Sequence, residues 1–101
     1  MRINLEAFLG MIGSLEELLD MSREDPSYFQ KCVCLCGNNM VTMEGEIKAL
    51  YSQITEAADM LPKGVMTKTL QFRLGEYGKS IELLSAVSSQ LRSSGGYVWV
   101  N

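Results

Sequence analysis

The sequence predicts an all-α protein: a short N-terminal helix followed by a long antiparallel helical hairpin, which dimerisation completes as a multi-helix bundle. Apolar residues recur at intervals of three and four, which places their side chains on one face of a helix. Helix-breaking residues are concentrated near residues 22–26, 62–64 and 93–96. These observations predict a single helical domain over residues 1–101, with helices at about 4–21, 26–61 and 67–92.

The first predicted helix begins after Asn4, whose side chain can accept a hydrogen bond from the exposed amides of the first turn. Its apolar face is formed by residues at the required spacing, namely Leu5, Phe8, Ile12, Leu15 and Leu19. Acidic residues lie on the opposite side. We therefore expect this helix to bury one face and expose the other.

The second predicted helix is the longest, because one apolar series runs through the middle of the chain. The series is Phe29, Val33, Cys36, Met40, Met43, Ile47, Leu50, Ile54, Ala57 and Leu61. Asp25 suits the N-terminal cap and Pro26 the first helical position. Gly37 and the two asparagines after it are poor helix formers, so a kink or a short interruption at 37–39 is the alternative to a continuous helix. The series keeps its spacing across this point, which predicts a continuous helix and no strand.

The third predicted helix follows the break at residues 62–64. Its inner face is expected to comprise Leu70, Leu74, Tyr77, Ile81, Leu84, Ser88 and Leu91. A connection of about five residues between two long helices favours an antiparallel hairpin.

Residues 93–101 are predicted to form a tail. Gly95 and Gly96 decouple this tail from the third helix, because glycine is costly to order. The last five residues alternate and have high β propensity. They include Tyr97 and the only tryptophan, Trp99. Because large aromatic side chains often dominate interfaces, we expect the tail to serve recognition or dimer contact. The alternative is that the tail folds back and covers the end of the helix bundle.

The composition argues against several classes of protein. A net charge of −3 has the wrong sign for a nucleic-acid binder. No stretch reaches the roughly 18 uncharged apolar residues that a membrane span needs, and no secretory signal is recognised. Three cysteines crowded together do not make a disulfide framework. We therefore expect no nucleic-acid partner, no membrane association and a cytoplasmic location, in a bacterium or a phage-infected cell.

The residues that could carry chemistry predict no enzyme and no cofactor. The chain has no histidine, so a serine or cysteine nucleophile lacks its usual base. Cys32, Cys34 and Cys36 form the most conspicuous motif. On a helix, Cys32 and Cys36 would share a face while Cys34 would point away, so we interpret the three as core residues. A metal site or redox sensor built on these thiols is the alternative.

The predicted function is protein–protein binding without catalysis, as a small cytosolic regulator, antiactivator or chaperone that holds a protein partner by helix packing. Three thin helices leave apolar surface uncovered, which favours a homodimer. The expected partner or dimer interface consists of Phe29, Val33, Met40, Met43, Ile47, Tyr97 and Trp99. A toxin-immunity protein, whose acidic surface would cover a basic active site, is a second hypothesis.

Overall fold

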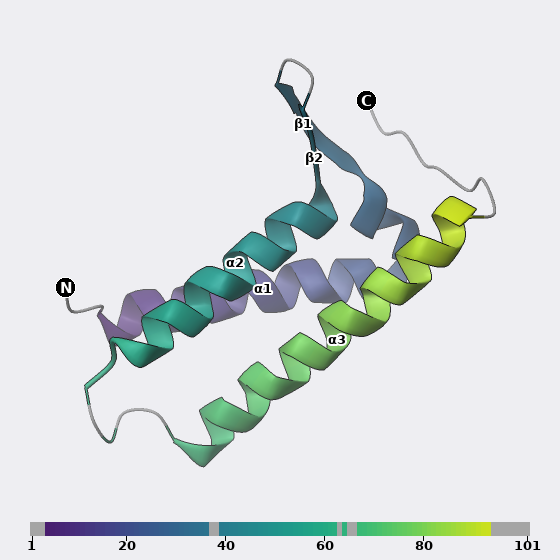
Figure 1. Cartoon of the computed structure of the whole chain (residues 1–101). Helices are drawn as coiled ribbons and strands as arrows, with labels where there is room; N and C mark the ends of the chain where they lie inside the picture. The colour runs from purple at the N-terminus through teal and green to yellow at the C-terminus, as the bar shows by residue number, and fades with distance from the viewer. Residues whose placement is uncertain (1–3, 37–38, 63, 65–66, 94–101) are drawn as a thin grey trace.

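The computed structural model describes residues 4–36, 39–62, 64 and 67–93. Its elements are α1 (Leu5–Glu24), a 3₁₀ helix η1 (Pro26–Gln30), strands β1 (Cys32–Cys36) and β2 (Asn39–Thr42), and helices α2 (Met43–Asp59) and α3 (Lys68–Ser93). The described chain is mostly helical, which confirms the predicted fold class in its coarse form. The three α-helices lie together, and the two strands project from one end of them (Figure 1).

Helix α1 forms as the sequence predicts. The Asn4 side chain caps it by accepting from the backbone N–H of Glu6 at 2.8 Å. The helix ends at Glu24, three residues later than expected, and Asp25 follows as its C-terminal cap. The Asp25 carboxylate then accepts from the Ser27 N–H at 3.2 Å, and Pro26 occupies the first position of η1.

The prediction of one continuous helix over 26–61 is wrong. After the 3₁₀ helix η1, the chain forms an antiparallel pair of strands, and α2 begins only at Met43. The paired residues are Cys32 with Thr42, Cys34 with Val41, Leu35 with Met40, and Cys36 with Asn39, with an irregularity between Cys32 and Cys34.

The physical reason lies in the composition of this segment. Nearly every residue from 32 to 36 and from 40 to 43 is apolar. Apolar residues therefore occur at intervals of three and four whether the segment forms a helix or strands. β-Branched residues such as Val33 and Val41 favour extended backbone. Gly37-Asn38 between two short apolar runs is a dipeptide typical of a β-hairpin. The apparent continuity of the series was therefore no evidence for a helix.

The base of the hairpin is closed by backbone and side-chain hydrogen bonds. The Met43 N–H donates to the Lys31 carbonyl at 2.9 Å, so the chain enters and leaves the hairpin at the same place. The Thr42 hydroxyl accepts from the Gly45 N–H at 3.3 Å and caps α2. Glu44 and Glu46 in the first turn add charge of the sign that stabilises a helix N-terminus.

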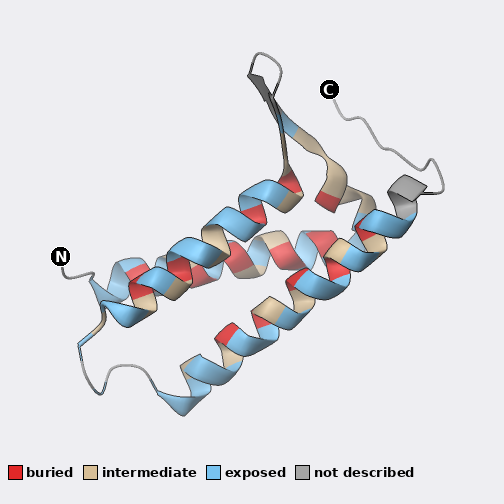
Figure 2. Cartoon of the chain, viewed as in Figure 1, coloured by how far each residue is buried: buried red, intermediate tan, exposed pale blue. Residues whose placement is uncertain are grey.

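The core lies between the inward faces of the three helices (Figure 2). Its buried members are Phe8, Ile12, Leu15, Leu19, Phe29, Ile47, Ile54, Ala57, Leu74, Tyr77, Ile81 and Leu84. Burial is uneven across the helices. The four core residues of α1 are at most 1% exposed, whereas those of α3 are 6–8% exposed. The spacing predicted most of the buried residues of α1 and α3 correctly, namely Phe8, Ile12, Leu15, Leu19, Leu74, Tyr77, Ile81, Leu84 and Ser88. It was wrong for Leu5, which is 42% exposed, and Leu70 is only partly buried. The burial of Leu91 lies outside what the structure describes.

Candidate functional site

The β1–β2 hairpin is apolar, and packing within the chain's own core does not explain this character. Its strands pack on each other, and β2 also contacts the start of α2. Val33 is 48% exposed and Met40 46% exposed. Neither strand contains a charged residue or proline, the usual protection of a sheet edge. An isolated two-stranded hairpin is only marginally stable in water, so these apolar strands are suited to further contacts.

The structure divides the predicted interface residues into three groups. Phe29, Met43 and Ile47 are buried within the chain's own core region. Val33 and Met40 are exposed on the hairpin. Tyr97 and Trp99, together with the predicted tail after Ser93, lie outside the described residues.

The three cysteines all lie on β1. The helical geometry that was expected to separate Cys34 from Cys32 and Cys36 therefore does not apply. Cys32 is half-buried at the base of the strand. Within the residues that the structure describes, no group of three or more histidine, cysteine or acidic side chains is placed to hold a metal ion.

A polar network fixes the base of the hairpin to α3. The Gln30 side-chain amide donates to the Ser88 hydroxyl at 2.6 Å and also to the Ser88 carbonyl. The Ser85 hydroxyl donates to the Glu44 carboxylate at 3.0 Å, and Lys48 pairs with Glu44 at 2.7 Å. Ser88 is fully buried, so this network provides the hydrogen bonds that a buried hydroxyl requires. It joins η1, α2 and α3 at the point where the strands leave the helices.

A second polar cluster joins α1 to α3. The Glu16 carboxylate accepts hydrogen bonds from the Tyr77 hydroxyl and the Arg73 guanidinium, and Arg73 Nε donates to the Tyr77 oxygen at 3.2 Å. The donation from Tyr77, and then that from Arg73, lowers the pKa of Glu16. Burial and the bond to Glu16 raise the pKa of Tyr77. A general acid at neutral pH needs a raised carboxyl pKa, so this cluster has the character of a structural ion pair.

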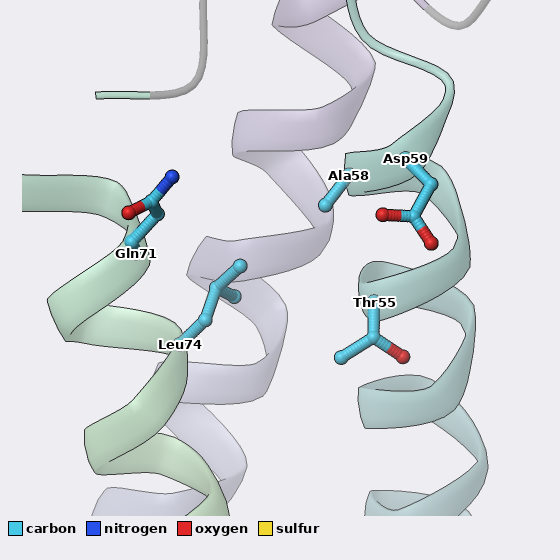
Figure 3. Close-up of a pocket in the computed structure, with 5 residues that line it drawn as sticks. All are labelled: Thr55, Ala58, Asp59, Gln71 and Leu74. Carbon is cyan, nitrogen blue, oxygen red and sulfur yellow. The ribbon is translucent and has the colours of Figure 1, made fainter. Parts of the chain in front are cut away.

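A groove of about 510 Å³ lies between the end of α2 and the start of α3. Thr55, Ala58 and Asp59 line it from α2, and Gln71 and Leu74 line it from α3 (Figure 3). The side chains stand on opposite walls without converging on a common point (Figure 3). Ligand sites usually combine an enclosed apolar cavity with convergent polar groups, and this groove lacks that arrangement.

Sequence reasoning missed both polar clusters, because the partners that join different elements are 41 to 61 positions apart along the chain. Gln30 and Ser88 are separated by 58 positions and Glu16 and Arg73 by 57. One signal was present: Ser88 occupies an inner-face position of the third predicted helix. A serine among buried apolar residues requires a hydrogen-bond partner, although the sequence does not identify which one.

The comparisons with known proteins give no match: no family model, curated protein or solved structure is similar to this chain at a significant level. In the described part of the chain, no helix combines the length and the apolar character needed to cross a membrane.

Proposed function

We propose that this chain is a non-catalytic protein-binding module that forms a homodimer through its β1–β2 hairpin and acts as a small cytosolic regulator or chaperone. The observation that supports this proposal is an uncharged apolar hairpin that projects from the helices (Figure 1) and on which Val33 and Met40 are exposed. Burial of such side chains is the main favourable contribution to most protein association.

The absence of charge on the strands favours a second copy of the chain as the occupant. In a twofold-symmetric pairing, the strand at the contact lies antiparallel to its own copy, so a charge near its middle would face a like charge. The residues 32–36 and 39–42 contain none. A chain of 101 residues also buries a limited share of its surface by itself, and association is a common remedy.

The titratable clusters support a binding role over a catalytic one. Glu16 is held in its ionised form between Arg73 and Tyr77, and Glu44 is engaged by Lys48 and Ser85. In these contacts, Glu16 links α1 to α3 and Glu44 links α2 to α3. The sequence contains no histidine to serve as a base for a nucleophile.

The test measures molar mass by light scattering at micromolar concentration, with Met40→Asp as the variant. The wild-type chain should give about twice its mass of 11.2 kDa. Met40→Asp should raise the dimer dissociation constant at least about tenfold, because it buries an unpaired charge in the contact. Circular dichroism should show unchanged helicity, since Met40 lies outside the core.

Met60→Asp is the matched control. Met60 is 50% exposed, close to the 46% of Met40, but it lies at the opposite end of α2. This variant should dimerise like the wild type. A monomeric wild-type chain, or equal weakening by the two substitutions, would reject the hairpin as the dimer contact.

A further inference from the structure

We propose that the outer face of α3 is a second self-association surface, on which two copies of the chain pair their α3 helices antiparallel about a twofold axis. This inference goes beyond the proposed function, because it uses a surface separate from the hairpin and joins hairpin dimers into larger assemblies. It commits to one occupant of this face, a second copy of the chain. The contact is made by four residues of α3, namely Phe72, Glu76, Lys79 and Leu83.

The first support is the exposure of two large apolar side chains on α3. Phe72 is 69% exposed and Leu83 68% exposed, more than Val33 or Met40 on the hairpin. The buried residues of α3 lie on its other side, turned toward α1 and α2 (Figure 2). A single exposed apolar residue is ordinary on a protein surface, so the occupant has to be identified from the residues around these two.

The second support is the spacing of the four residues. Positions 72, 76, 79 and 83 follow intervals of four, three and four, which is the heptad spacing of side chains that line the contact between two helices. All four are exposed. From Phe72 to Leu83 they cover about three turns of helix, a length of about 16 Å.

The third support is that this row of residues is complementary to itself. In an antiparallel pairing about an axis midway between Glu76 and Lys79, Phe72 of one copy faces Leu83 of the second copy. Glu76 likewise faces Lys79. A twofold contact requires such matching of one surface with itself, and here apolar residues meet apolar residues while opposite charges meet. A parallel pairing would place each charge opposite its own copy, which is unfavourable.

The two charged side chains already form an ion pair within the chain, which does not oppose this contact. Lys79 Nζ lies 3.4 Å from Glu76 Oε1, and both side chains are exposed. Exposed ion pairs of this kind contribute little to stability. Glu76 and Lys79 can therefore turn to a second copy at low cost, and the pairs across the contact then determine its register.

The first experiment measures molar mass by sedimentation equilibrium. The contact is short, below the roughly 1,200 Å² of stable interfaces, so we expect it at about 0.1–1 mM. Over this range the wild-type mass should rise above its value at low micromolar concentration. Leu83→Asp should weaken this association at least about tenfold, because its charge would face Phe72. Leu9→Asp is the matched control, since Leu9 is 44% exposed on α1. The proposal fails if Leu83→Asp and Leu9→Asp associate to the same extent.

The second experiment reverses charges and changes only exposed side chains. Glu76→Lys places a lysine opposite Lys79 of the second copy, and Lys79→Glu places a glutamate opposite Glu76. Each variant alone should associate at least about tenfold more weakly than the wild type. An equimolar mixture of the two should regain the wild-type association, because every lysine at the contact then faces a glutamate.

Glu56→Lys is the control for charge, because it makes the same change at an exposed position of α2 and should associate like the wild type. Both contact variants keep a negative net charge, since the chain carries −3 and each substitution changes it by two units. General attraction between them therefore does not explain a restored association. A mixture that stays as weakly associated as its components would overturn the proposal. These masses are compared with the low-micromolar value, so the result does not depend on the hairpin dimer.

Discussion

Gly75 and Gly78 lie one turn apart on α3 but meet different surroundings. A Cβ atom at Gly75 would have open space around it, whereas one at Gly78 would lie 2.8 Å from the Tyr51 hydroxyl oxygen. That hydroxyl donates to the Leu74 carbonyl at 3.0 Å. Gly78 therefore permits the close approach of a tyrosine on α2, while Gly75 has no comparable role.

We predict opposite effects for the same substitution at these two glycines. Gly75→Ala should raise the free energy of unfolding by about 0.5–1 kcal/mol, because alanine is the better helix former. Gly78→Ala should lower it by about 1 kcal/mol, because displacing Tyr51 outweighs that gain. Urea denaturation measures both. The loss at Gly78 should shrink in a Tyr51→Phe background, and equal stabilisation at both positions would contradict the close contact.

Glu16 should give the protein a measurable pH dependence. Its pKa in the folded state is lowered by Tyr77 and Arg73. Its ionised form therefore contributes to stability above about pH 4.5, the ordinary glutamate value, and this contribution is lost as the pH falls through the folded-state pKa. Glu16→Gln should be less stable than the wild type at pH 7, and the difference should decrease in acid. Urea denaturation from neutral to acidic pH measures this.

The control for this effect is Glu17→Gln. Glu17 is an exposed neighbour on α1, and its replacement should leave the acid dependence of stability close to that of the wild type. A constant difference between Glu16→Gln and the wild type at every pH would show that packing, and not ionisation, is responsible.

Among the elements, the β1–β2 hairpin contributes least to the hydrophobic core. Lys31 and Met43 are joined by a backbone hydrogen bond, and Cys32 and Thr42 are partners across the strands. The helices on either side therefore stay connected through the base of the hairpin. Val33 and Met40 farther along are about half exposed.

We predict that the hairpin can be removed without loss of the helical fold. Replacing residues 33–41 by Gly-Gly leaves a two-residue turn between paired positions. Helicity and cooperative unfolding should be retained, with a change of about 1 kcal/mol or less, while the dimer should be lost. Circular dichroism and light scattering measure these properties. Asn38→Gly, which keeps both strands, is the control and should dimerise; unfolding of the shortened chain would instead show that the hairpin supports the core.

At the level of the whole molecule, the sequence predicted the helical class and the elements with a clear polar face. In helix α1, Glu6, Glu17 and Asp20 lie on the side away from Phe8, Ile12 and Leu15, so only one face can be buried. The segment around β1 offers no such contrast, because Cys32, Val33, Cys34 and Leu35 are all apolar. Periodicity cannot distinguish strand from helix in such a run, and the Gly37-Asn38 turn signal was the information that should have decided it.

The candidate site was predictable only in part for a related reason. A three–four spacing identifies a face but does not reveal what covers it. Phe29 and Ile47 were expected at an interface, yet α1 and α3 of the same chain bury them. Met40 was placed in the same series and is exposed because the backbone leaves the helical path before reaching it. The polar partners of Ser88 depend on the packing of three elements, which no local pattern contains.

The lighter burial of α3 implies that the molecule does not open uniformly. Regions with few buried apolar contacts can detach at a free energy below that of global unfolding. In α3 these contacts are weakest toward Lys68, where Leu74 borders the open groove, and firmest at the fully buried Ser88. Opening would therefore begin at the Lys68 end and stop at the Gln30–Ser88 contact. Backbone amides of the first turns of α3 would exchange with solvent well before those of α1, and a protease would reach this end of the helix first.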